Sequence, residues 1–158
     1  MDNDLTLRQH LVSLMTKPNA HVTFAHSIEG LAPELRAVRP AGVEHSVWEL
    51  LEHLRIAQWD ILDFSRNAAY VEAKFPDDYW PASPVPMSEA AWKESVARFN
   101  SDLKAMCALV QDPATDLFAK IPWGNGQTIL REAMLVADHN AYHVGQIVVV
   151  RRLLGAWG

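Results

Sequence analysis

Cysteine is almost absent from this chain of 158 residues. The single cysteine, Cys107, has no second thiol in the chain to pair with, so an internal disulfide is excluded and a reducing compartment is favoured. Glycine and proline are also few, at 7 and 9 residues, which excludes collagen-like and low-complexity chains. A hydrophobic fraction of 49% and a charged fraction of 21% instead indicate an ordinary globular protein.

Long hydrophobic runs and an excess of basic residues are missing too. The longest apolar runs, such as 133–137 and 147–150, fall far short of the roughly 18 residues that a membrane-spanning helix needs, so we expect no membrane partner. The acidic start, residues 1–4, lacks the basic and apolar regions of a secretory signal, which predicts a cytoplasmic location. The net charge is −5, and no cluster of basic residues is present to attract the phosphate backbone of a nucleic acid. We therefore expect no nucleic-acid partner.

Apolar residues recur at intervals of three and four positions along most of the chain. Runs that alternate between apolar and polar residues are missing, so the pattern predicts an all-α fold. No repeat or separate linker divides the sequence, and its length suits one domain over residues 1–158. Four amphipathic helices in one domain are typical of a four-helix bundle. The expected helices cover residues 5–16 with 18–30, 46–70, 88–112 and 128–154.

Capping signals and helix breakers set these boundaries. Thr6 with Gln9, and Ser46 with Glu49, have the three-residue spacing of a capping box, in which each side chain bonds the backbone N–H of the other residue. Pro18 interrupts the first segment, because proline is tolerated in the first turn of a helix but not in its interior. The first helix is therefore expected to begin near Thr6 and to be divided in two at Pro18.

A long connection, residues 72–87, joins the second and third expected helices. It contains four prolines around Tyr79 and Trp80. Long connections that are ordered tend to have a function. We therefore expect this one to cover a pocket, with Tyr79 and Trp80 as candidates for substrate contacts.

Three histidines lie on inward faces of two expected helices. His139 and His143 are four residues apart, about one helical turn, and Val136 shares their face. His53 shares a face with Leu50 on the second helix. An imidazole in an apolar interior loses its hydrogen bonds to water, so three of them in one core need a common partner.

A divalent metal ion would supply that partner. Zinc and similar cations bind neutral imidazole nitrogens, and three protein ligands leave one coordination position open for water or substrate. Zinc is expected ahead of nickel, although three imidazoles suit both. The alternative is that His139 and His143 are core histidines, satisfied by the backbone or by Asp138, Asn140 and Tyr142. The four-residue spacing alone does not distinguish a metal site from packed core histidines. A third histidine, His53, on another inward face favours the metal site.

Other chemically active side chains receive weaker assignments. Asp60 lies seven residues after His53 and Glu132 seven before His139, so each is a candidate for a general base or an outer partner of the site, or else a surface carboxylate. Cys107 is interpreted as a core residue. No catalytic residue is assigned. The remaining histidines are interpreted as solvated or packing residues; they are His10, His21, His26 and His45.

The stretches Ser46–Leu54 (SVWELLEHL) and Asp138–Gln146 (DHNAYHVGQ) resemble the DinB-like family of metal-binding four-helix bundles. The likeness extends over most of the chain. It implies an up-down-down-up bundle with a long second connection and a divalent metal held by His53, His139 and His143. Relatives are often homodimers, so the resemblance also implies a homodimer.

The resemblance further implies a class of reaction. Characterised members of the superfamily include transferases and isomerases that use a low-molecular-weight thiol, so a thiol-dependent S-transferase with a small-molecule substrate is the first hypothesis. A cation lowers the pKa of a bound thiol and holds the thiolate at neutral pH. A related hydrolase would use water at the same position. The alternatives are a non-catalytic metal-binding or stress-response protein, and a structural bundle whose histidines only pack.

Overall fold

The computed structural model describes residues 3–158, which form α-helices and no strand, so the predicted all-α class is confirmed. Within this range, no helix has the length and apolar character that crossing a membrane requires. Two short 3-10 helices, η1 (Pro33–Leu35) and η2 (Asp77–Tyr79), lie in the connections. The α-helices are α1 (Asn3–Thr16), α2 (Phe24–Ile28), α3 (Val47–Arg66), α4 (Glu89–Gln111) and α5 (Ile129–Leu153).

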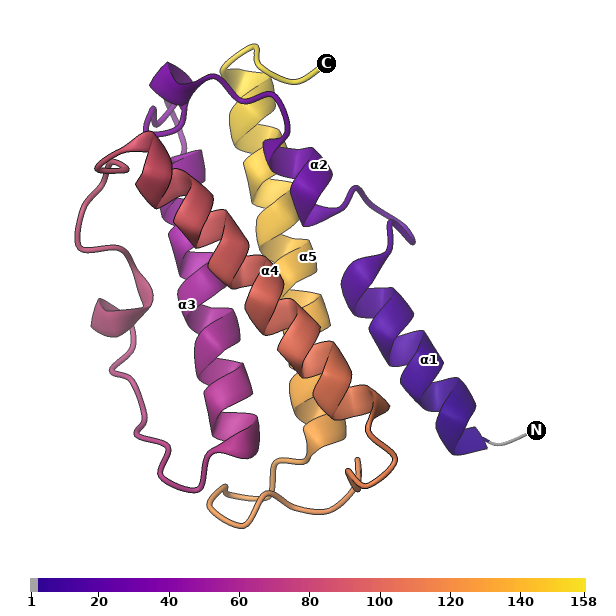
Figure 1. Ribbon diagram of the computed structural model, residues 1–158. Coiled ribbons are helices and arrows are strands. Elements are labelled where there is room, and N and C mark those ends of the chain that lie inside the picture. The colour runs from indigo at the N-terminus through magenta and orange to yellow at the C-terminus, as the bar shows by residue number, and fades with distance from the viewer. Residues whose placement is uncertain (1–2) are drawn as a thin grey trace.

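The three longest helices, α3, α4 and α5, pack on one another, and α1 lies alongside α4 and α5 (Figure 1). The short helix α2 packs on α5, and η2 packs on α3 within the connection that leads to α4. The buried side chains form two apolar clusters, one including Leu62 and Val136 and the other including Leu50 and Phe99. Two polar side chains, Gln58 and Asn140, lie between the helices. Gln58 of α3 accepts a hydrogen bond from Asn140 of α5 at 2.8 Å and donates one to a backbone carbonyl of α4.

The predicted starts of α3, α4 and α5 are confirmed. Ser46, Ser88 and Thr128 each accept a hydrogen bond from a backbone N–H of the first helical turn. At Ser46 the capping box is complete, because the Glu49 carboxylate accepts from the Ser46 backbone N–H at 2.9 Å. These helices begin at capping residues that the sequence alone identifies.

The predicted end of the first helix at residue 16 and its division at Pro18 are confirmed, but its predicted start and the predicted extent of its second part were wrong. Because α1 already begins at Asn3, Thr6 lies inside the helix and does not cap it. The stretch predicted as helix from 18 to 30 is helical only in α2, which Thr23 caps. After Pro18, the Asn19 amide donates to the carbonyls of Ser13 and Lys17, at 2.9 and 3.0 Å. This bonding closes the end of α1 with a turn and prevents a direct continuation.

The predicted end of the second long helix, near Tyr70, was also too late. The helix α3 ends at Arg66, and Asn67 follows with extended backbone angles. The Asn67 side chain donates to the carboxylate of Asp63 and accepts from the backbone N–H of Ala69. A short polar side chain thus offers the backbone an alternative to the helix, and the long connection begins there.

Candidate metal centre

The three predicted histidines come together between α3 and α5. One ring nitrogen from each of His53, His139 and His143 lies within 4.8 Å of the others, and could hold a metal ion. The Nε2 atoms of His53 and His139 are 3.1 Å apart. His53 and His143 are 6% and 8% exposed, and His139 is half-buried. The four-residue spacing on α5 and the inward face of α3 therefore place the rings as the sequence predicts.

A backbone carbonyl fixes the orientation of the His53 ring. The Nδ1 atom of His53 lies 2.8 Å from the carbonyl oxygen of Tyr79. A carbonyl only accepts, so Nδ1 carries the proton and the Nε2 lone pair is left facing His139. Metal-binding histidines commonly have this outer hydrogen bond, which sets both the tautomer and the ring orientation.

A glutamine does the same for His143. Its Nδ1 atom lies 2.6 Å from the Oε1 atom of Gln146, which is one turn further along α5. The Nε2 atom of His143 is thereby free to act as a ligand. His139 differs from the other two, because its Nδ1 atom is buried without a hydrogen-bond partner among residues 3–158. Two of the three rings are thus prepared as neutral nitrogen donors by acceptors within the described chain.

The three imidazoles are held in the neutral form. Burial and the neighbouring rings of His143 and His53 lower the pKa of His139 to about 4. Burial lowers the pKa of His143 to about 4 as well, although the hydrogen bond with Gln146 acts in the opposite direction. Burial also lowers the pKa of His53. Because the neutral ring is the form that binds a metal, the chemistry of this donor set fits a divalent cation of the zinc type.

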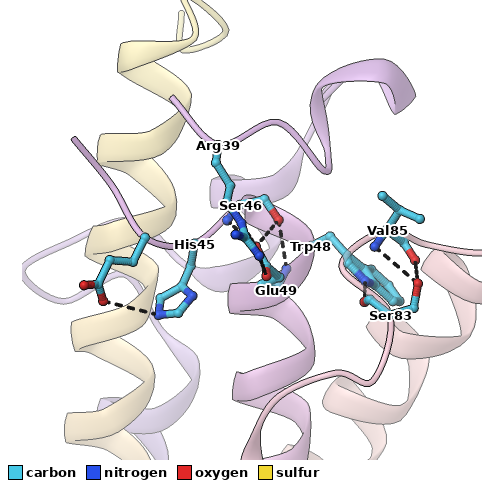
Figure 2. Close-up of polar contacts among 8 residues, drawn as sticks. Arg39, His45, Ser46, Trp48, Glu49, Ser83 and Val85 are labelled. Atoms are coloured by element: carbon cyan, nitrogen blue, oxygen red, sulfur yellow. Dashed lines mark hydrogen bonds and ion pairs between the residues drawn. The ribbon is translucent and has the colours of Figure 1, made fainter. Parts of the chain in front are cut away.

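The long connection covers one face of the His53 ring. The indole of Trp80 stacks on the ring of His53 with 4.2 Å between the centroids, and His45 stacks on Trp80 at 3.9 Å. Trp80 therefore lies between two imidazoles. A second contact holds the connection on α3, since the indole Nε1 of Trp48 donates to the carbonyl of Ser83 at 3.0 Å (Figure 2). The predicted covering role of this connection agrees with these contacts.

A cavity of about 720 Å³ lies beside the centre. His143 and Gln146 of α5 form part of its wall, and Trp80 and His45 form another part. Figure 2 shows His45 directly before the cap of α3, where the complete capping box holds the backbone. Among residues 3–158, no lysine or arginine lines the cavity, and most of the exposed surface of its wall is apolar. The volume is in the range of pockets for small molecules.

The other candidate residues do not join the histidine cluster. Asp60 accepts hydrogen bonds from the hydroxyls of Tyr70 and Tyr79, at 2.9 and 2.7 Å. Glu132 is not a surface carboxylate, since it is 2% exposed and accepts from Arg131 at 2.7 Å. Cys107 is buried, as expected for a core residue, and burial raises the pKa of its thiol.

Sequence reasoning missed His45. It was interpreted as a solvated or packing residue, and it does pack on Trp80, but its place in the wall of the cavity depends on where the distant connection folds back. Gln146 carried a recognisable signal, because a residue three positions after a histidine on the same helix reaches its ring. Tyr79 stays a candidate for a substrate contact, and its carbonyl and hydroxyl contact His53 and Asp60, which the sequence did not indicate.

The chain matches the model of a known protein family. A model of the DinB superfamily matches residues 20–147, a span that includes the three histidines and the whole connection between α3 and α4. Neither the curated proteins nor the solved structures contain a significant match to the chain.

Proposed function

The chain belongs to the DinB superfamily, and from this premise we propose that it binds a divalent cation through His53, His139 and His143. The observation that carries the proposal is the convergence of one ring nitrogen from each of three imidazoles within 4.8 Å. Zinc is the first choice and nickel the second, because both accept nitrogen donors. The same family membership supports an up-down-down-up arrangement of α1, α3, α4 and α5. It also supports a homodimer, which light scattering in solution would test.

We further propose that the protein is an enzyme acting on a small molecule, most simply a thiol-dependent S-transferase or a related hydrolase. When bound, the cation would lower the pKa of a thiol or water and so provide a nucleophile at neutral pH. The chain contributes the orientation of the rings through Tyr79 and Gln146. The indole of Trp80 keeps bulk water from one face of His53, and the cavity beside His143 gives the substrate room.

The main alternative is a non-catalytic metal-binding protein, which would need no access for a substrate. The cavity of about 720 Å³ that reaches His143 argues against such a closed site. Binding of a small anion or a thiol to the cobalt-substituted protein would change its visible spectrum if a coordination position is open. An unchanged spectrum would favour the non-catalytic alternative.

The first experiment is elemental analysis of untagged protein purified without a metal-affinity column. We expect roughly one zinc or nickel per chain in the parent and its loss in a His143→Ala variant. A His21→Ala variant is the matched control, because His21 is exposed and lies on the segment between α1 and α2. A parent protein that is free of metal and does not take up added zinc would contradict the proposed site.

The second experiment tests the reaction. The metal-loaded protein is assayed for conjugation of bacillithiol, mycothiol and glutathione to electrophiles, and for hydrolysis of amides and esters. We expect metal-dependent turnover in at least one of these assays, lost in the His143→Ala variant and kept in His21→Ala. Metal binding without turnover in any of them would leave the non-catalytic alternative.

A further inference from the structure

One residue of the long connection contacts α3 at two separate points. The carbonyl of Tyr79 accepts from His53 Nδ1 at 2.8 Å, and the hydroxyl of Tyr79 donates to Asp60 Oδ2 at 2.7 Å. His53 and Asp60 are seven residues apart on α3, which corresponds to two helical turns, or about 10 Å along the axis. Tyr79 therefore spans the distance between a histidine of the centre and a carboxylate two turns away.

Each oxygen of the Asp60 carboxylate accepts a hydrogen bond from a tyrosine hydroxyl. Its Oδ1 atom accepts from the Tyr70 hydroxyl and its Oδ2 atom from the Tyr79 hydroxyl. Hydrogen bonds to a carboxylate are stronger than those between neutral groups. All three side chains are half-buried, so competition from water is reduced. Asp60 thus holds the segment that follows α3 through two tyrosine hydroxyls.

The segment around Tyr79 needs such a contact. The helix η2 has only three residues and no side-chain hydrogen bond at its cap, and the sequence on both sides contains Pro76 and Pro81. Within the segment the Lys74 N–H donates to the Asp78 carboxylate at 2.8 Å and the Tyr79 N–H to the Pro76 carbonyl at 3.1 Å, but neither bond involves the Tyr79 carbonyl or fixes its direction. The attachment of Tyr79 to Asp60 supplies that direction, because the phenol ring and the backbone of Tyr79 move together.

We propose that Asp60 is a positioning residue of the histidine centre: by holding the Tyr79 hydroxyl, it keeps the Tyr79 carbonyl on His53 Nδ1 and so directs His53 Nε2 toward His139 and His143. This inference rests on the proposed metal site and deepens it. Tyr70 makes the matching contact with Asp60 but places no group on a histidine. The two tyrosines therefore form a natural pair for comparison.

The first test measures zinc affinity by competition with a chromophoric chelator. Loss of an outer partner of a metal-binding histidine costs roughly 10- to 100-fold in affinity. We expect a loss of about tenfold in Tyr79→Phe and in Asp60→Ala, and less than twofold in Tyr70→Phe. The double variant with Asp60→Ala and Tyr79→Phe should lose no more than either single variant, because both changes break the contact between Asp60 and Tyr79. The contact with Tyr70, which Asp60→Ala also breaks, is expected to add little. Equal losses in Tyr70→Phe and Tyr79→Phe would overturn the inference.

The second test needs no metal. Nitrogen-15 NMR of the imidazoles in the metal-free protein reports which nitrogen of His53 carries the proton. We expect the Nδ1–H tautomer in the parent and in Tyr70→Phe, and a mixture of tautomers in Tyr79→Phe and Asp60→Ala. An unchanged tautomer in the last two variants would overturn the inference, with circular dichroism as the check on folding. If the parent bound no zinc, the proposed function would fail, and this spectrum would still decide the role of Asp60.

Discussion

At the scale of single residues, the acceptor on the outer side of each imidazole determines what its inner side can bind. His53 has the Tyr79 carbonyl and His143 has the Gln146 amide oxygen. The two acceptors differ in kind, because one belongs to the backbone of a distant connection and the other to a side chain on the same helix. The Gln146 side chain can be replaced without altering the path of the backbone. A substitution there therefore tests the role of the outer acceptor more directly than a change in the connection would.

We predict that Gln146→Leu lowers the zinc affinity by roughly 10-fold or more, because His143 Nδ1 would lose its acceptor and the ring its fixed tautomer. The measurement is a zinc titration in competition with a chelator. Gln9→Leu is the control, since Gln9 is an exposed glutamine on α1. Equal affinities for the two variants would show that the bond between Gln146 and His143 does not support metal binding.

The positions of the three histidines could be predicted from the sequence, but part of their surroundings could not. Residues four apart on a helix share a face whatever the rest of the fold, so His139 and His143 follow from the spacing. The stacking of Trp80 on His53 joins residues 27 positions apart through a connection with no periodic pattern. No local rule specifies such a contact.

At the scale of elements, the start of α3 combines a cap with an ion pair. Burial on its own would raise the pKa of the Glu49 carboxyl, but hydrogen bonds from Arg39 and Ser46 outweigh it, and the pKa is lowered (Figure 2). A carboxyl whose pKa is lower in the folded protein stabilises that state above its unfolded pKa. This contribution decreases as the pH falls below 4.5, the ordinary value, and through the folded pKa.

We predict that Glu49→Gln lowers the free energy of unfolding by about 1 kcal/mol at neutral pH, because glutamine can keep the capping box but loses the ion pair with Arg39 and the negative charge at the start of the helix. The difference from the parent should shrink as the pH is lowered into the acid range, because the parent carboxyl becomes protonated there. Urea unfolding at a series of pH values measures it. Glu44→Gln should show little effect at any pH, since the Glu44 side chain is 93% exposed.

The helix boundaries show where prediction succeeds at this scale and where it fails. Ser46, Ser88 and Thr128 cap helices through bonds within one turn, and such local bonds can be read from the sequence. The end of α3 depends instead on Asn67, whose amide competes with the helix for hydrogen bonds. The interior position of Thr6 has no comparable signal, because a hydroxyl residue is tolerated in a helix as well as at its cap.

At the scale of the whole molecule, the proposed metal site links α3 to α5. Those helices are far apart in the sequence, and the rings of the site come from both. A ligand that binds only the folded chain stabilises it by mass action, by about 2.7 kcal/mol at a concentration 100 times its dissociation constant. Metal occupancy is therefore expected to affect the stability of the entire chain.

We predict that zinc at this excess raises Tm by roughly 5 to 10 °C, because about 1 kcal/mol corresponds to 2–4 °C for a chain of this size. A chelator should reverse the shift. Differential scanning calorimetry of the parent, with His143→Ala as the variant that cannot respond, is the measurement. The same upward shift in His143→Ala would mean that zinc binds elsewhere.

The all-α class of the whole chain could be predicted because the apolar periodicity runs through the sequence. The attachment of α1 could not. The buried side chain of Arg8 donates to the carbonyls of Val110, Asp112 and Thr115, at 2.7, 2.9 and 2.8 Å. From the sequence alone, an arginine in a helix is predicted to lie at the surface. Only the three-dimensional arrangement shows that the guanidinium of Arg8 lies at the C-terminal end of α4, where positive charge is favourable.

The stacking of Trp80 on His53 also gives the protein an internal optical reporter. A cation arriving at His53 would place positive charge near the face of an indole whose centroid is 4.2 Å from that imidazole. The emission of Trp80 should therefore shift or be quenched when the site fills. Replacing Trp80 with Phe should abolish the response while the other five of the six tryptophans continue to emit. Site occupancy could then be followed in real time without any added dye.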